Sequence, residues 1–383
     1  MTGNNAGGRG RHRRALAAAC VTVTGLGMAG SASAAHAAAA AHAQPRTTGP
    51  WRVVKTVTGP GDPYFSAVTA PSSTSAWAFE AVTEGPAKPT AWRLANGTWS
   101  QVPFPGGAGD IVESASSTSP SNVWAFTQIQ YGPRNHYKAR SRALRWNGSS
   151  WATMGSFRRN INGAAVIGPR DVWAFGSLFV PGANLGARHY NGHRWVNVRS
   201  GHGLVAGSAL SASSVWAVGS TQVAHWNGHT WSRTSVASLL PKHTQLSLPE
   251  LTGIYAQSAA SVWAVGTANR QDEGGPAILL HYNGHTWSRV AARARHYSNP
   301  VQVVPDGAGG LWIPVPGILG GASHLLHYSG GHLTAVALPG GATRTSVNAV
   351  SSGPHGGVSF GAGFTHRANQ PGRGQRAVIL ESR

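Results

Sequence analysis

Ser261-Val262-Trp263-Ala264-Val265-Gly266 carries the pattern that decides the fold, an apolar run built around a tryptophan. Six runs of this kind occur at intervals of 43 to 49 residues. The other five are centred on Trp77, Trp124, Trp173, Trp216 and Trp312, and a degenerate seventh copy is Val358-Ser359-Phe360-Gly361. A fixed period of this length is the signature of a repeat architecture. Seven such units account for nearly all of the chain after residue 50.

The repeat around Trp263 divides into four short apolar segments separated by turn residues. We expect strands over Leu251 to Ala256, Ser261 to Thr267, Ala277 to Asn283 and His285 to Val290. Short Val, Trp and Ala runs among 51 glycines and 23 prolines suit many strands joined by turns. The units are therefore predicted to be four-stranded antiparallel sheets.

The last two strands of each unit meet at an Asn-Gly dipeptide, the strongest short hairpin signal. At Asn283-Gly284 we expect a two-residue type I′ turn, which would place Tyr282 opposite His285 and Leu280 opposite Trp287. The dipeptide recurs at Asn96-Gly97, Asn147-Gly148, Asn191-Gly192 and Asn227-Gly228. In the first of these the following tryptophan, Trp99, comes one residue earlier than in the others.

All fifteen tryptophans fall in such repeat positions, either in the second strand or in or beside the later hairpin. Large aromatic side chains dominate core energetics, so we interpret them as packing between units. A platform for stacking sugars is the alternative interpretation.

The two ends of the repeat array complement each other. The seventh unit offers strands at Ser346 to Val350, Val358 to Gly361 and Ala377 to Glu381, and then the sequence stops. Trp51 to Lys55 has the pattern of a fourth strand with no first three before it. A ring in which this segment completes the last unit explains both deficits and leaves no exposed sheet edge. The sequence thus predicts an all-β fold, a seven-bladed β-propeller, as one domain over 51–383.

The first 34 residues have the pattern of a secretory signal peptide. A basic segment ending at Arg14 precedes an apolar run from Ala15 to Ala29 and an Ala32-Ser33-Ala34 cleavage site, although later sites extend to residue 43. The run is short for a membrane span. We therefore expect a secreted protein, possible association with the cell wall, a flexible segment over 35–50 and no transmembrane segment after signal removal. Cys20, the single cysteine, would leave with the signal.

The chain is strongly basic, with a formal net charge of +20. Removal of four signal arginines leaves 27 basic against 11 acidic residues, a net charge of +16. Such a charge favours an anionic partner such as a polymer or protein at the cell surface, or it merely keeps a secreted protein soluble. No basic helix or long basic run marks a dedicated nucleic-acid motif.

Strand order determines which loops share an end of the ring. Connections from fourth to first strand and from second to third emerge at one end, where they are long; we call this end the long-loop face. Binding residues usually lie on such loops above a rigid scaffold. The candidate ligand-binding residues there are Asp62, Asp110, Glu113, Arg134 and Glu250. The alternative is that long solvated loops simply collect charged residues.

Catalysis is less well supported than binding. A glycosidase needs two carboxyl groups about 5–10 Å apart, and whether any two of Asp62, Asp110, Glu113 and Glu250 converge depends on loop paths. Tyr64 and Tyr255 are available to a sialidase-like mechanism but lack a distinctive context. The His225/His229 and His281/His285 pairs straddle hairpins, so we expect their imidazoles to point apart. We predict no catalytic residue, no metal and no cofactor.

The Trp-Ala-Val-Gly strand and the Asn-Gly-x-x-Trp hairpin resemble secreted bacterial propeller repeats of the broad galactose-oxidase/kelch type. The resemblance covers 51–383 and implies a fold rather than an activity. Galactose-oxidase chemistry uses a cysteine that the mature chain would lack. We expect an extracellular, monomeric, non-enzymatic propeller that binds an anionic or carbohydrate polymer or a protein at the cell surface. A secreted carbohydrate-active enzyme, a hydrolase or lyase, is the alternative.

Overall fold

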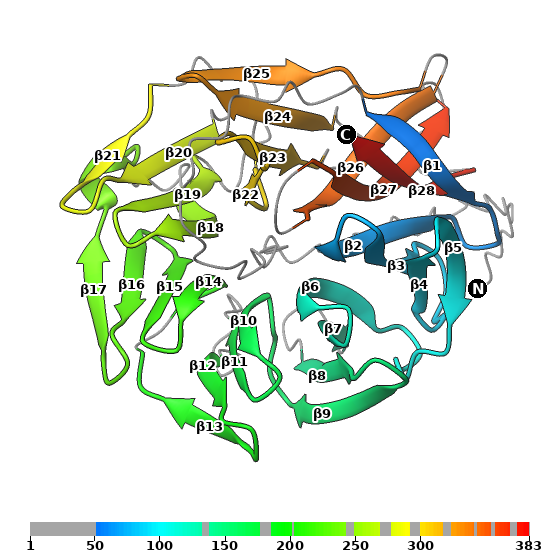
Figure 1. Cartoon of the computed structure of the whole chain (residues 1–383), viewed down its shortest axis with the longest axis horizontal. Coiled ribbons are helices and arrows are strands. Elements are labelled where there is room, and N and C mark those ends of the chain that lie inside the picture. Colours follow the sequence, from blue (N-terminus) through cyan, green and yellow to red (C-terminus); the bar gives the residue numbers. More distant parts are fainter. Residues whose placement is uncertain are drawn as a thin grey trace, which may run out of the picture.

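Seven four-stranded antiparallel sheets surround a common axis in the computed structural model of this chain (Figure 1). The structure describes residues 51–131, 138–176, 185–200, 203–242, 249–268, 277–291, 299–316, 323–340, 343–353, 357–367 and 374–382. Within these residues the chain contains strands and one short 3-10 turn, η1 (Ala237–Leu239), and no α-helix. The predicted seven-bladed β-propeller is confirmed.

Each of the first six blades uses four consecutive strands, running outward from the axis. Blade 1 consists of β2 (Pro63–Ser72), β3 (Ser75–Val82), β4 (Thr90–Ala95) and β5 (Thr98–Val102). Blade 2 consists of β6 (Ile111–Ser119), β7 (Asn122–Tyr131), β8 (Lys138–Trp146) and β9 (Trp151–Phe157). Blade 3 consists of β10 (Gly163–Gly168), β11 (Asp171–Gly176), β12 (Gly186–Tyr190) and β13 (Trp195–Val198). Blade 4 consists of β14 (Ala206–Ser211), β15 (Ser214–Gly219), β16 (Gln222–Trp226) and β17 (Trp231–Ser235). Blade 5 consists of β18 (Glu250–Ser258), β19 (Ser261–Thr267), β20 (Ala277–Tyr282) and β21 (Trp287–Arg289). Blade 6 consists of β22 (Val304–Pro305), β23 (Leu311–Val315), β24 (His324–Ser329) and β25 (His332–Val336).

Blade 7 closes the ring with a strand from the other end of the repeat array. It contains β26 (Thr343–Ser352), β27 (Ser359–Arg367) and β28 (Arg376–Ser382), and its outermost strand is β1 (Arg52–Val57). Val53 pairs with Leu380 in the β1–β28 ladder, and Figure 1 shows the two strands side by side. Because β1 covers the outer edge of β28, blade 7 has the same four-stranded form as its neighbours.

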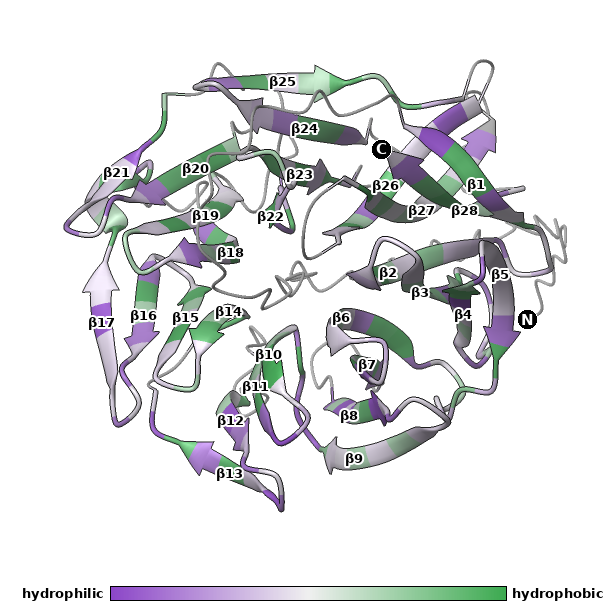
Figure 2. Ribbon diagram, in the orientation of Figure 1, coloured by the Kyte–Doolittle hydropathy of each residue, from purple (hydrophilic) through white to green (hydrophobic). Residues whose placement is uncertain are grey.

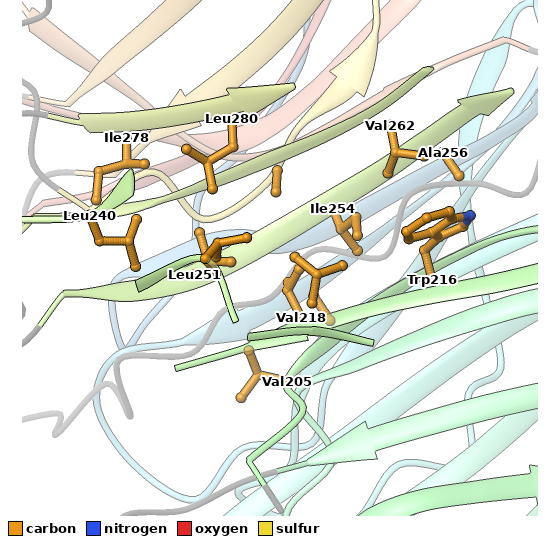
Figure 3. Close-up of a cluster of buried hydrophobic side chains, with 14 of the residues drawn as sticks. Val205, Trp216, Val218, Leu240, Leu251, Ile254, Ala256, Val262, Ile278 and Leu280 are labelled. Atoms are coloured by element: carbon orange, nitrogen blue, oxygen red, sulfur yellow. The ribbon is translucent and has the colours of Figure 1, made fainter. Parts of the chain in front are cut away.

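The apolar core is divided into seven clusters, one at each contact between neighbouring blades. The cluster between blades 4 and 5 contains Val205, Trp216 and Val218 from one side and Leu251, Ile254 and Leu280 from the other (Figure 3). The corresponding clusters at the other six contacts follow the same plan. The four largest fully buried side chains are Trp77, Trp124, Trp173 and Trp312. Packing between blades, rather than sugar stacking, therefore accounts for the second-strand tryptophans at these positions.

Burial falls from the axis outward. Inner strand β14 is mostly buried, whereas outer strand β17 is mostly exposed, and Figure 2 shows β14 largely green and β17 pale and purple. The four-stranded blade thus places apolar residues against neighbouring blades and Ser, Thr and Arg at the rim. No helix in the described ranges is long and apolar enough to span a bilayer.

The predicted geometry of the Asn-Gly turns is wrong in four of the five cases. Tyr282 pairs with Trp287, not with His285, and Leu280 pairs with Arg289. The loop therefore has four residues, and the Asn283 side-chain oxygen accepts the backbone N–H groups of His285 and Thr286. Only Asn96-Gly97 has positive φ at both residues, as a type I′ turn requires. The earlier position of Trp99 was the sequence signal that separates the two loop lengths.

The glycine that ends the Trp-Ala-Val-Gly motif allows close backbone contact. A Cβ on Gly266 would overlap the backbone carbonyl of Glu250, and one on Gly219 would overlap that of Gly203. Those carbonyls belong to the segments that enter the inner strands β18 and β14. The motif glycine therefore fixes how closely the inner strand approaches the second strand at the long-loop face.

Candidate functional site

Hydrogen bonds at the blade entrances show that the two kinds of long connection share one end of the ring. The backbone N–H groups of Thr83 and Glu84, between β3 and β4, donate to the carbonyl of Gly61, which precedes β2. Gly109 N–H, just before β6 of blade 2, donates to the carbonyl of Ala87, which lies between β3 and β4 of blade 1. Connections from fourth to first strand and from second to third therefore meet at the long-loop face, as the strand order requires.

Asp62 joins blade 1 to blade 7 on this face. Its Oδ1 accepts the backbone N–H of Gln375 at 3.0 Å, and its own carbonyl accepts the hydroxyl of Thr83. Asp62 has φ of 55°, a left-handed conformation in which Asp is one of the tolerated non-glycine residues. The carboxylate thus acts as an acceptor that secures two loops.

Asp110 lies immediately before β6 and is almost fully buried. Its Oδ2 accepts the backbone N–H of Gly107 at 2.9 Å and the hydroxyl of Thr127 at 3.1 Å. The Arg142 guanidinium forms an ion pair with the same oxygen at 3.1 Å. A buried carboxylate requires such partners, and these link the blade entrance to β7 and β8.

Glu113 occupies the position where the register of the β6–β7 ladder shifts, between Val112 and Ser114. Gln128 Nε2 donates to Glu113 Oε1 at 2.7 Å, while Glu113 Oε2 is buried without a hydrogen-bond partner. Burial raises the pKa of Glu113 to about 7, and the bond from Gln128 opposes the rise. Burial therefore favours the protonated form of this carboxyl group.

Tyr64, on the neighbouring inner strand β2, is part of the same surroundings. Burial raises its pKa well above the ordinary value for a phenol, and the negative charge of Glu113 raises it further. The phenol therefore keeps its proton. Tyr64 was noted in the sequence, but its proximity to Glu113 requires the contact between blades 1 and 2.

Glu250, another candidate, belongs to a different blade from Asp110 and Glu113. Glu250 begins β18 in blade 5, is buried, and has partners within the fold. Arg134 lies outside the described residues. Among the candidates that the structure describes, Asp110 and Glu113 share blade 2, where they contact the consecutive β7 residues Thr127 and Gln128.

Acids and histidines away from the long-loop face are used in packing. Asp171 and Asp306 bond His189 and His327 at 2.8 and 2.7 Å. His225 lies on Trp216 at a centroid distance of 4.1 Å, whereas His229, four residues on, is exposed in the turn. Across the described parts of the chain, no group of three or more His, Cys, Asp or Glu residues could hold a metal ion.

Sequence reasoning missed several buried amides near the blade entrances. Both polar side-chain atoms of Asn160 and the Oδ1 of Asn299 are buried without hydrogen-bond partners, as is the Oε1 of Gln128. An amide gives no distinctive sequence pattern, because Asn and Gln are common in exposed loops as well. Their burial becomes visible only when neighbouring blades are packed together.

Comparison with known proteins supports the fold. No family model and no curated protein matches the chain. Among solved structures, YCF48 bound to D1 peptide is 12% identical over 88% of this chain and 98% of that one, with a TM-score of 0.53. The extracellular domain of a two-component system from B. thetaiotaomicron is 12% identical over 88% of this chain and 40% of that one, with a TM-score of 0.57. The GH74 xyloglucanase from Xanthomonas campestris is 13% identical over 85% and 55%, with a TM-score of 0.54. These likenesses establish that the chain has a β-propeller fold.

Proposed function

We propose that this protein is an extracellular, non-enzymatic binding propeller that holds a protein or polymer at the cell surface through its long-loop face. The observation that carries the proposal is that Asp62 and Asp110, on the long-loop face, hold loops and strands together through their carboxylates. Asp62 links blade 7 to blade 1, and Asp110 holds the segment around Gly107 against Arg142. These carboxylates make a rigid rim beneath the long connections, which suits a platform for binding.

The character of the partner follows from charge and from the structural neighbours. The expected net charge of +16 attracts a partner that is acidic overall. The neighbours include a propeller with a bound peptide and an extracellular domain, and their identities are too low to transfer a ligand. The charge therefore favours an acidic protein or an acidic polymer. The same proposal includes export directed by residues 1–34, with cleavage as late as residue 43. It also includes a monomeric domain over 51–383 that is related to propeller repeats of the galactose-oxidase/kelch type.

Binding arrays test this function directly. The exported chain, probed against surface proteins, glycans and wall polymers, should retain a partner in salt near physiological strength. Arg134→Ala, in the sequence between β7 and β8, should weaken binding. Arg194→Ala should not, because Arg194 is exposed in the Asn191-Gly192 loop on the opposite face. Equal losses for the two variants would indicate non-specific attraction to a basic surface. A uniformly silent array would refute the proposal.

A secreted carbohydrate-active enzyme is the second candidate, and Glu113 is the observation that favours it. A carboxyl group with a pKa of about 7 has the property required of a general acid at neutral pH. Hydrolysis of polysaccharides, including xyloglucan, would be measured for the natural chain and for Glu113→Gln. Reducing-end release that the substitution abolishes would favour this candidate over binding alone.

A further inference from the structure

Strands β7 and β8 continue past the rest of blade 2 at the long-loop face. The last β7 residue that pairs with β6 is Gln128, and the last β8 residue that pairs with β9 is Ser141. The ladder between β7 and β8 goes on for three more pairs and ends with Tyr131 opposite Lys138. We call these three pairs, residues 129–131 and 138–140, the β7–β8 extension.

The extension has two open strand edges. Within the described residues no third strand pairs with it, and no backbone hydrogen bond from a described loop reaches it. In blade 4, by contrast, Gln222 pairs with both Gly219 and Ser235, so the corresponding hairpin ends level with its outer strand. Open edges present N–H and C=O groups that a further strand can pair with.

One face of the extension carries an aromatic ring and two cations. The register places Tyr131 opposite Lys138 and Ile129 opposite Arg140, and residues two apart along a strand share a face. Tyr131, Lys138 and Arg140 are exposed, Tyr131 to 45%. Ile129 is half-buried, and a Cβ on Gly109 would lie 2.9 Å from its Cδ1. The base of the extension is therefore packed against the entrance of blade 2.

The two cations have no acid within the described part of the chain. Arg142, the next residue on the same face of β8, pairs with Asp110 at 3.1 Å. No ion pair joins Lys138 or Arg140 to a described carboxylate. The charge of β8 is thus balanced at the base of the extension and unbalanced above it.

We infer that the outer edge of β8 at residues 138–140 is the docking edge for an extended, acidic segment of a protein partner. The inference rests on the proposed binding function and specifies how the partner is held. A strand added beside β8 would place side chains about 7 Å apart, at alternate positions, next to Lys138 and Arg140. Carboxylates there would accept a bidentate pair of N–H bonds from Arg140 and one from Lys138.

Charge and backbone chemistry together select this occupant. Cations on an open edge discourage pairing with a second copy of the same chain, and the expected net charge of +16 adds to that repulsion. An acidic polysaccharide would neutralise the cations, but it has no regular row of N–H and C=O groups to match a strand edge. An acidic polypeptide satisfies both the charges and the edge.

Synthetic peptides and the full-length chain provide the test. The probe is a capped seven-residue peptide in which glutamate alternates with threonine. In one control glutamine replaces each glutamate, and in the other the same residues are rearranged so that the glutamates are consecutive. In calorimetry the alternating probe should bind at least tenfold more tightly than either control. It should also slow amide hydrogen exchange at least tenfold at the outward-facing amides of 138–140.

Two substitutions on the extension and one elsewhere separate docking from general charge effects. Arg140→Gln should weaken binding of the alternating probe about tenfold, and Lys138→Gln should weaken it severalfold, because an ammonium makes a less directional pair. Arg194→Gln, at an exposed arginine on the opposite face, should leave binding unchanged. All three side chains are exposed, so the melting temperatures should stay the same.

Several outcomes would overturn the inference. Equal losses for Arg140→Gln and Arg194→Gln would reduce the attraction to net charge. Equal binding of the rearranged peptide, or unchanged exchange at 138–140, would reject strand addition. Tighter binding of oligogalacturonate that is lost in Arg140→Gln would indicate a polysaccharide instead. If the peptides fail while the array gives a partner sensitive to Arg134→Ala, the proposed function stands without this docking edge. If the peptides bind and the array is silent, the proposed function fails.

Discussion

His189 stacks on Trp173 with ring centroids 4.4 Å apart and an angle of 15° between the planes. The same contact joins His225 to Trp216, His281 to Trp263 and His327 to Trp312. In each case the imidazole Nε2 also bonds an acid or a serine: Asp171, Ser214, Ser261 or Asp306. The recurrence of histidine in the repeats is therefore explained by packing, and in blade 1 the guanidinium of Arg93 lies over Trp77 instead.

Two of these histidines, His225 and His281, lead us to predict that the protein loses stability in mild acid. Burial lowers the pKa of His225 and of His281 below the ordinary value near 6.5. The folded state then binds fewer protons than the unfolded state, so the free energy of unfolding is highest above about pH 6.5 and falls as the pH drops through that value towards the folded pKa. Urea unfolding at pH 8 and pH 5 measures the difference. The double variant His225→Gln/His281→Gln should have a smaller pH slope, whereas His229→Gln, in an exposed turn, should keep it.

Because β1 closes the ring, we predict that a substitution at Trp51, just before β1, strongly lowers the free energy of unfolding. Trp51 is buried against Trp312, with centroids 5.3 Å apart. Trp51→Ala should lower the free energy of unfolding by about 3–5 kcal/mol, the usual cost of removing a buried aromatic side chain. Val53→Ala, on the exposed side of β1, should change it by less than about 0.5 kcal/mol. Similar small effects for both would show that β1 is not needed to close the ring.

The close approach at Gly266 predicts that even a methyl group is harmful there. Gly266→Ala should destabilise the protein by about 2 kcal/mol or more, because the methyl meets the backbone carbonyl of Glu250 rather than a movable side chain. Gly168→Ala is the matched control, since a Cβ at Gly168 meets nothing within 4 Å. Thermal unfolding of the two variants compares them. Equal melting temperatures would contradict the close packing described for this motif.

Glu113 predicts a pH effect of the opposite sign to that of the histidines. Its pKa rises from an unfolded value near 4.5 to about 7 in the folded state. The stability associated with the neutral carboxyl is complete below about pH 4.5 and is lost as the pH rises through 7. Glu113→Gln removes this loss, so its stability relative to the natural chain should increase from pH 5 to pH 8. A difference that is constant over this range would mean that Glu113 is not perturbed by burial.

Local pattern predicted the ring because each blade repeats one arrangement of apolar positions. The pairing of Trp51 to Lys55 with the last unit could be inferred from a strand missing at one end and surplus at the other. The hairpin register could not, because Asn283 accepts two backbone N–H groups and so favours a four-residue loop over the type I′ turn. Loop length was decided by hydrogen bonds of one side chain rather than by the dipeptide.

The candidate site was predicted less completely than the ring. Asp62, Asp110 and Glu113 do lie at blade entrances, as strand order requires, but their partners come from other loops and strands. The Glu113–Gln128 bond depends on a register shift in the β6–β7 ladder, which alternation of apolar residues does not specify. The electrostatic effect of Glu113 on the pKa of Tyr64 depends in addition on how two blades pack.

The pairing of β1 with β28 has a consequence for biosynthesis. Strand β1 is synthesised first and its partner β28 last. Arg52 and Glu381, which pair between these strands, are therefore separated by almost the whole sequence of the domain. Until translation reaches that point, β1 presents unsatisfied backbone groups that neighbouring chains can capture. A nonsense codon or proteolytic cut within the final blade would make that exposure permanent, and such fragments should aggregate rather than persist as smaller rings.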